Sequence, residues 1–166
     1  MIPIYKTVLT IKNNTIDIQK DIIKEYHSLE HQQTRLKGSY NFKLSSKYNS
    51  LIVELSEKFI DQINKLYNIN FDNKKQLDVW AYVSNNSFYD AVIHNHKRTA
   101  KINGVYYLNV PESEGGELEF YDDYNNKIGE IKPNTNDLLI FDGSLNHKPI
   151  PSNSIEYRIA LNMEIR

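Results

Sequence analysis

The spacing of apolar residues in the N-terminal part of the chain is mainly that of helices. Over residues 17–36 and again over residues 52–66, apolar side chains recur every three or four residues, or at multiples of that spacing, on otherwise polar segments. This pattern predicts two amphipathic surface helices. A run rich in β-branched and aromatic residues over 2–11 predicts a strand before them, and the polar stretch 38–47 between them is predicted to be a loop.

From residue 77 onward the spacing changes to that of strands, with short apolar runs separated by clusters of Gly, Pro, Asn and Ser. The predicted strands span residues 77–83, 89–96, 102–110, 117–121, 128–131, 137–142, 146–150 and 155–165. Roughly eight strands at this spacing favour a mainly β fold, an antiparallel sandwich or barrel, with the jelly roll as the natural candidate. We expect the two helices to pack on one outer face of a sheet, and the single tryptophan, Trp80, to pack in the core.

Length and composition narrow the class of protein. A chain of 166 residues fits one domain, with an N-terminal strand and helices over 1–76 and a jelly-roll core over 77–166. Lys and Arg number 20 against 21 Asp and Glu, which argues against nucleic acid or an anionic membrane as partner. The sequence shows neither a signal peptide nor an apolar run long enough to span a membrane, so we expect a soluble, cytoplasmic protein. Because cysteine is absent, any metal must be held by His and carboxylate side chains.

Three of the five histidines have the spacing of a metal site. His94 and His96 stand at i and i+2 of a predicted strand, which places both rings on one face because strand side chains alternate sides. His147 follows about fifty residues later in another short strand and could complete the site from across a barrel. Neutral imidazoles bind Fe(II), Zn and other first-row ions, and a site with three protein ligands leaves positions open for substrate. The spacing therefore predicts a shared metal site.

Arg158 lies in the last predicted strand on the face opposite Tyr157 and Ile159. An inward-facing arginine requires an anion. That anion is either a carboxylate of the chain, with Glu117, Glu119 and Asp142 as candidates, or the carboxylate of a ligand bound in bidentate fashion.

Five fragments of the chain occur in an order that is familiar from one enzyme family. They are His94, the tyrosine-bearing run 105–109, the Gly-Gly-Glu turn and strand over 115–120, the strand pair over 131–141 that precedes His147, and Arg158. With these fragments the chain from residue 80 to 162 resembles the iron(II)- and 2-oxoglutarate-dependent dioxygenases, in particular their prolyl-hydroxylase-like branch, which includes small members common in phages and marine bacteria.

The resemblance implies a fold, an activity and roles for individual residues. The fold would be a cupin-like double-stranded β-helix. The protein would lie in the cytoplasm of a bacterium or of a virus-infected host cell. His94 and His147 would bind Fe(II), Arg158 would pair with the 5-carboxylate of 2-oxoglutarate, and Tyr107 would donate a hydrogen bond to the same carboxylate. Iron and 2-oxoglutarate together would activate O₂, release succinate and CO₂, and hydroxylate a C–H bond of a substrate such as a prolyl or other residue of a protein or peptide.

One position departs from the family's pattern. The usual motif is His-x-Asp or His-x-Glu, which completes a triad of two histidines and one carboxylate, whereas this chain has His96 at that place. The site is then a working three-histidine centre, recruits a carboxylate from Asp90 or Asp142, or belongs to an inactive descendant; we favour His96 as the third ligand. Two other classes stay open: a cupin-like three-histidine metalloprotein that needs no 2-oxoglutarate, and a non-catalytic jelly-roll binding or structural module of a virus.

Overall fold

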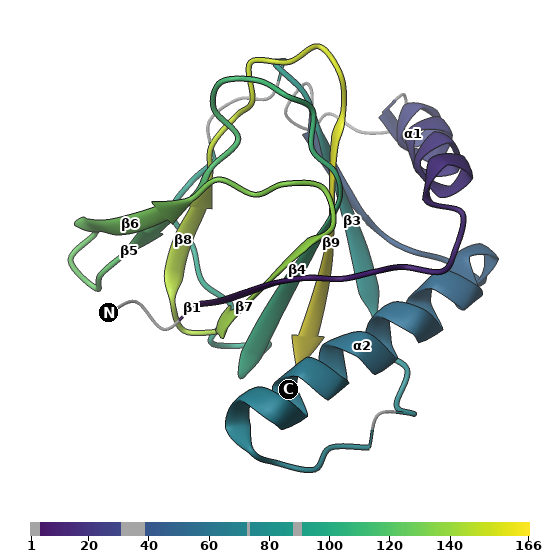
Figure 1. Cartoon of the computed structure of the whole chain (residues 1–166). Helices are drawn as coiled ribbons and strands as arrows, with labels where there is room; N and C mark the ends of the chain where they lie inside the picture. The colour runs from purple at the N-terminus through teal and green to yellow at the C-terminus, as the bar shows by residue number, and fades with distance from the viewer. Residues whose placement is uncertain (1–3, 31–38, 73, 88–90) are drawn as a thin grey trace.

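The computed structural model describes all residues except 1–3, 31–38, 73 and 88–90, and its regular elements are two antiparallel sheets and two α-helices, with one short 3₁₀ turn (Figure 1). The larger sheet has six strands in the order β1-β7-β4-β9-β3-β2, and the smaller has three in the order β6-β5-β8. The strands are β1 (Ile4–Val8), β2 (Ser39–Lys43), β3 (Val79–Ser84), β4 (Ile102–Asn109), β5 (Leu118–Tyr121), β6 (Lys127–Ile131), β7 (Asp137–Asp142), β8 (Asn146–Pro149) and β9 (Arg158–Ile165). The predicted mainly β architecture is confirmed.

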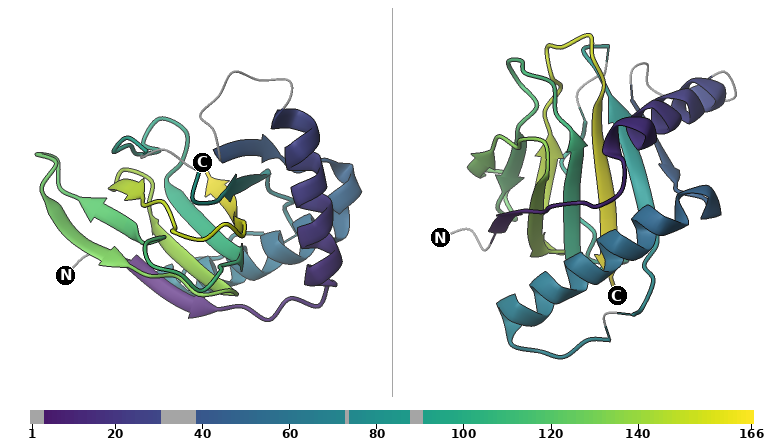
Figure 2. Two further views of the ribbon diagram at one scale, coloured as in Figure 1. Left: turned by 90° about the horizontal axis from the view of Figure 1, so that it is seen from above. Right: turned by 45° about the vertical axis from the view of Figure 1, so that its right-hand side comes forward.

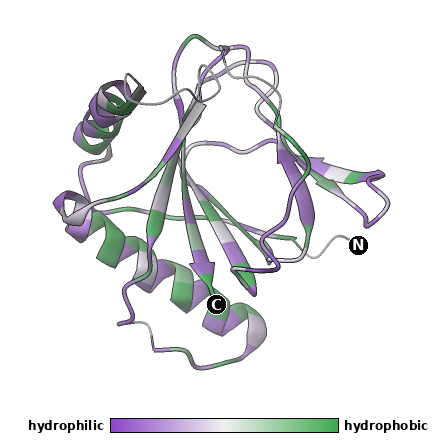
Figure 3. Ribbon diagram, turned by 180° about the vertical axis from the view of Figure 1, so that it is seen from behind, coloured by the Kyte–Doolittle hydropathy of each residue, from purple (hydrophilic) through white to green (hydrophobic). Residues whose placement is uncertain are grey.

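Both helices lie on the same side of the larger sheet, away from the smaller one (Figure 2). They are α1 (Thr15–Glu30) and α2 (Asn49–Tyr67), and a 3₁₀ turn (Ser46–Tyr48) leads into α2. Hydrophobic and hydrophilic bands follow one another along α2 (Figure 3). Its hydrophobic residues recur every three or four positions and form one stripe that is buried against the sheet. The helix ends where Asn68 adopts a left-handed conformation, with φ of 51°. The sequence prediction of two helices on one outer face is confirmed.

The larger sheet separates two apolar clusters. On its outer face, Ile159, Leu161 and Met163 of β9 pack in the cluster shared with both helices. On its inner face, Ala160 of the same strand belongs to a smaller cluster with residues of β4, β5 and β7. Because side chains alternate along a strand, Arg158 faces inward together with Ala160, between the two sheets.

Three predictions about individual elements are wrong. The predicted loop 38–47 contains β2, an edge strand that pairs with β3. The predicted strand 89–96 is not a strand over 91–96, where one isolated bridge joins His94 to His147, and its beginning lies outside the described residues. Trp80 is 43% exposed, because it has the same orientation along β3 as Tyr82 and lies near the end of the inner face rather than in the core.

No helix in the part of the chain that the structure describes is both long and apolar enough to cross a lipid bilayer.

Candidate metal and oxo-acid site

A pocket of about 460 Å³ opens between the two sheets. Its floor comes from the central strands β4 and β9 of the larger sheet, and β8 and the segment 91–96 close the opposite side. The pocket brings together the five residues predicted to bind the metal or the oxo acid, His94, His96, His147, Tyr107 and Arg158, and Asp142, the alternative ligand, does not line it.

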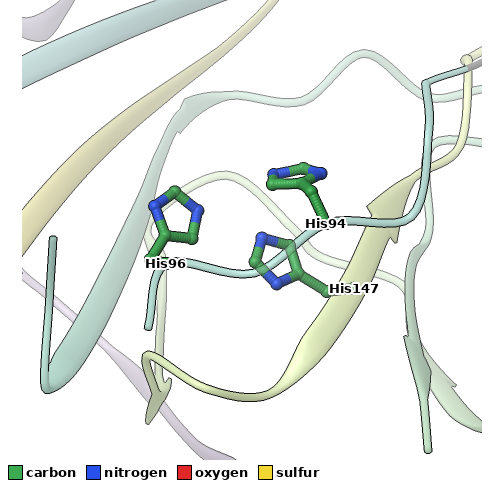
Figure 4. A group of neighbouring side chains, drawn as sticks. All are labelled: His94, His96 and His147. Carbon is green, nitrogen blue, oxygen red and sulfur yellow. The ribbon is translucent and has the colours of Figure 1, made fainter. Parts of the chain in front are cut away.

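The three histidines converge in this pocket from two segments of the chain (Figure 4). The backbones of His94 and His147 are joined by reciprocal hydrogen bonds of 3.0 and 2.9 Å, so one isolated bridge attaches the segment that carries His94 to β8 at the edge of the smaller sheet. The ring centroids lie 4.4 Å apart for His94 and His147, 5.2 Å for His96 and His147, and 5.4 Å for His94 and His96. Each histidine has one ring nitrogen that lies within 4.8 Å of a ring nitrogen of each of the other two. Within the described residues, these three histidines form the only cluster of this kind that could hold a metal ion.

Hydrogen bonds at Nδ1 prepare all three rings to bind a metal through Nε2. Nδ1 of His94 lies 3.1 Å from the Val92 carbonyl oxygen, and Nδ1 of His147 lies 2.9 Å from the Leu145 carbonyl oxygen. Nδ1 of His96 lies 2.8 Å from Oε1 of Glu164. Each partner is an acceptor, so the proton belongs on Nδ1 and the lone pair on Nε2.

The environment also favours neutral imidazoles, which is the form that binds metal. Burial lowers the pKa of His147 to about 3, against the opposing effect of the Leu145 carbonyl, and the other two histidines add to the lowering. His94 is more exposed, but the desolvation that it does experience lowers its pKa, against the opposing effect of the Val92 carbonyl, and the neighbouring His96 adds to the lowering. At neutral pH both rings are therefore unprotonated at Nε2.

Neither alternative carboxylate ligand, Asp90 or Asp142, belongs to the histidine cluster in the described residues. Asp142 lies at the exposed end of β7, where its Oδ1 accepts hydrogen bonds from the backbone N–H and hydroxyl of Ser144 at 2.8 and 2.6 Å. Asp90 lies outside the described residues. The carboxylate that does approach the histidines is Glu164, through His96. Sequence reasoning missed Glu164, although its even number places it on the same face of the last strand as Arg158.

Arg158 is a buried cation with no anionic partner among the described residues. Its side chain is 4% exposed, and Nη1 donates a hydrogen bond of 2.7 Å to the Gly116 carbonyl oxygen. The carboxylates that could have neutralised it are engaged elsewhere: Glu117 pairs with Lys132 at 3.5 Å and Glu119 with Lys127 at 2.6 Å. A guanidinium buried in a pocket in this state is suited to bind an anion from solution.

Tyr107 lines the same pocket from β4, opposite Ala160 of the neighbouring strand. Burial raises the pKa of Tyr107 to about 12, although the positive charge of Arg158 works in the opposite direction. The phenol is therefore a hydrogen-bond donor at any physiological pH, as an anionic ligand beside Arg158 would require.

Asn103 is a further polar group in the pocket that the sequence did not indicate. It is 1% exposed, lies on β4 in register with Glu164 of β9, and lines the pocket. Neither its amide nitrogen nor its amide oxygen has a hydrogen-bond partner among the described residues. Since a buried unpaired amide is costly, its place in the pocket suits contact with a bound ligand or water.

Comparison with known proteins identifies the class to which this fold and site belong. The family profile of the 2OG-Fe(II) oxygenase superfamily matches residues 71–166, more than half of the chain. The chain therefore belongs to this superfamily of enzymes, for which Fe(II) and 2-oxoglutarate are the typical cofactor and co-substrate. Comparison with curated protein sequences gave no significant match.

Among solved structures, similar folds include three prolyl hydroxylases. A Pseudomonas putida prolyl-4-hydroxylase aligns over 98% of this chain and 92% of its own with a TM-score of 0.66 and 13% identity. The viral collagen prolyl hydroxylase of Paramecium bursaria Chlorella virus-1, solved with 2OG, aligns over 98% and 96% with a TM-score of 0.61 and 16% identity. A Trichoplax adhaerens prolyl hydroxylase, solved with a hypoxia inducible factor peptide fragment, aligns over 97% and 83% with a TM-score of 0.61 and 16% identity. These likenesses, together with the family match, confirm the double-stranded β-helix fold.

The donor set of this chain fits the cofactor of the family. Three imidazoles with free Nε2 atoms suit Fe(II), and three protein ligands leave coordination positions open for a co-substrate. The Arg158 guanidinium, which has no anionic partner where the structure describes the chain, and the Tyr107 phenol in the same pocket supply the donors that a dicarboxylic oxo acid needs.

Proposed function

We propose that this protein is an Fe(II)- and 2-oxoglutarate-dependent dioxygenase that hydroxylates a C–H bond in a residue of a protein or peptide, with a prolyl residue as the first candidate. His94, His96 and His147 bind the iron, Arg158 binds the 5-carboxylate of 2-oxoglutarate, and Tyr107 donates a hydrogen bond to that carboxylate. The observation that carries the proposal is a buried guanidinium, without an anionic partner in the described part of the chain, in the same pocket as a three-histidine cluster.

The residues of the chain bind, orient and exclude water. When bound, Fe(II) and 2-oxoglutarate supply the oxidising chemistry, using O₂ and releasing succinate and CO₂. The apolar side chains Val105, Leu118 and Ala160 separate the polar groups of the pocket and limit the access of water to it. The carbonyl groups behind His94 and His147 hold these rings in the tautomer that binds metal.

The peptide substrate is supported by the similarity in fold to prolyl hydroxylases, one of which was solved with a peptide fragment. The pocket opens beside Val92, which is 78% exposed on the segment that carries His94 and His96. A substrate chain that crosses this segment would bring a side chain to the metal without entering the pocket as a whole.

The experiment has two stages. Purified protein with Fe(II), ascorbate and 2-oxoglutarate is assayed for succinate, with His147→Ala as the inactive variant and His27→Ala, on α1 outside the pocket, as the matched control. We expect turnover by the wild type and the control and none by His147→Ala. A wild type that neither binds nor turns over 2-oxoglutarate would refute the dioxygenase proposal.

The second stage presents a library of proline-containing peptides and of matched peptides without proline, and mass spectrometry detects the gain of one oxygen atom. Oxygen gain on proline supports the prolyl assignment. Succinate formation with oxygen gain confined to other residues would retain the dioxygenase proposal and discard proline as the target.

A further inference from the structure

The carboxylate of Glu164 stands directly behind one of the three candidate ligands. Its Oε1 lies 2.8 Å from Nδ1 of His96, and the side chains of His96 and Glu164 are 20% and 24% exposed. His96 is its only partner among the ion pairs of the described residues. The pair is therefore a histidine–carboxylate contact in a partly desolvated place, not a member of a surface charge network.

The backbone around His96 is fixed, so the contact is not that of a loose side chain. The N–H of His96 donates to the Gly143 carbonyl oxygen at 2.7 Å, and its own carbonyl oxygen accepts from the N–H groups of Thr99 and Ala100 at 2.8 Å. Glu164 lies near the end of β9, where Asn103 of β4 is its register partner, and the preceding residue, Met163, is paired with both β4 and β3. Backbone hydrogen bonds on both segments thus place the ring and the carboxylate against each other.

This contact bears on the charge of the site. Three neutral imidazoles give the metal one negative charge fewer than the two histidines and one carboxylate typical of non-haem Fe(II) oxygenases. A carboxylate that accepts the Nδ1 proton of a ligating imidazole makes the other nitrogen a stronger donor and fixes the ring orientation. The carboxylate of Glu164 is thus separated from the metal position by the His96 ring, and His96 is the residue that stands in place of the usual carboxylate ligand.

We propose that Glu164 is a positioning residue that supplies negative charge to the metal through His96 and so compensates for the missing carboxylate ligand. This inference rests on one part of the proposed function, the binding of a metal ion by the three histidines. The metal can be bound and measured without 2-oxoglutarate, so the two can be tested separately.

The test titrates Co(II) alone into the protein and follows its visible absorption. Glu164→Gln keeps a hydrogen-bond acceptor but removes the charge, Glu164→Ala removes both, and Glu57→Gln removes the same charge from an exposed position on α2 as the matched control. We expect the Co(II) dissociation constant to rise about 10- to 100-fold in Glu164→Ala and about tenfold in Glu164→Gln, with altered absorption bands. The control should bind like the wild type.

A double-mutant cycle shows whether the charge acts through the ring. In the His96→Ala background, Glu164→Gln should change the Co(II) dissociation constant by less than about twofold, because the path through the imidazole is gone. Glu164→Asp, which retains the charge, should recover part of the affinity that Glu164→Gln loses, and this comparison also covers the case in which Glu164→Ala fails to fold.

Three results would overturn the proposal, and they are distinguishable. Wild-type affinity and spectrum in Glu164→Gln would reduce Glu164 to a structural neighbour. A full effect of Glu164→Gln without His96 would show that the charge does not act through the ring. A wild type that binds no Co(II) would overturn both this inference and the metal site of the proposed function, whereas the first two results leave that function intact.

Discussion

Replacing Arg158 by lysine is the sharpest test of how the pocket binds 2-oxoglutarate. Lysine keeps the positive charge but replaces a planar fork of donors by a single ammonium on a shorter reach. A guanidinium has five N–H donors, and in this structure the described residues take up one of them, through Gly116. Enough donors remain for a bidentate bond to a carboxylate, which lysine cannot form.

The magnitude follows from the number of bonds lost. A hydrogen bond to a charged group contributes about 1.5–3 kcal/mol. Arg158→Lys loses about one such bond, and at about 1.4 kcal/mol per factor of ten the dissociation constant for 2-oxoglutarate should rise about 10- to 100-fold. Arg158→Met loses both bonds and the charge, which corresponds to about 3–6 kcal/mol and a rise of at least about a hundredfold.

The assay is calorimetric titration of 2-oxoglutarate into Mn(II)-loaded protein without O₂, which measures binding apart from turnover. Arg166→Lys, an exposed position at the end of the chain, is the matched control. The affinity for Mn(II) itself should not change in Arg158→Lys, because the candidate metal ligands are the three clustered histidines and Arg158 is not one of them. If Arg158→Lys binds 2-oxoglutarate within about threefold of the wild type, the bidentate contact that underlies this estimate does not exist.

Three further substitutions test other parts of the structure. Asn103→Leu should raise the unfolding free energy of the ligand-free protein by about 1–3 kcal/mol in chemical denaturation, because it removes a buried amide without a partner among the described residues. The same substitution should weaken 2-oxoglutarate binding. A lower unfolding free energy would contradict the cost assigned to the amide. Glu54 accepts hydrogen bonds from Asn13, and although partial burial opposes ionisation, these and the backbone bonds lower its pKa below 4.5. Its contribution is therefore fully present above about pH 4.5 and lost as the pH falls through the folded-state pKa, so the cost of Glu54→Gln, about 1.5 kcal/mol at pH 7, should shrink in urea titrations at lower pH. Gly104→Ala should cost about 1–3 kcal/mol of unfolding free energy in the same assay, because the added Cβ would clash with the buried Phe59 ring, and an unchanged midpoint would show that the ring can move aside.

Much of the fold follows from local patterns in the sequence. The helices α1 and α2 and most strands of the second half were predicted because their apolar spacing is set by the face that they bury. Alternation also placed Arg158 on the face opposite Ile159, as the structure shows. These features depend on neighbours a few residues apart, and the sequence contains that information directly.

The misses arise where tertiary contacts decide. The edge strand β2 is polar, and it pairs with β3 only because the fold brings the two together. The segment that carries His94 looks like a strand in sequence but makes a single bridge, to His147. Trp80 was expected in the core on residue type alone, whereas alternation along β3 would have placed it with Tyr82 on the other face.

The register of β9 links the two halves of the candidate site. Arg158 and Glu164 share one face of this strand, and Ile159 and its alternate neighbours share the other, in the apolar cluster under the helices. A slip of one residue would carry both charged side chains into that cluster and turn the apolar ones toward the pocket. Burying two charges without partners would cost several kcal/mol each, so the core that fixes the register also fixes the distance between the oxo-acid end and the metal end of the pocket. Substitutions in the apolar face of β9 should for this reason weaken 2-oxoglutarate and metal binding together, whereas substitutions at Arg158 or Glu164 should affect one of them at a time.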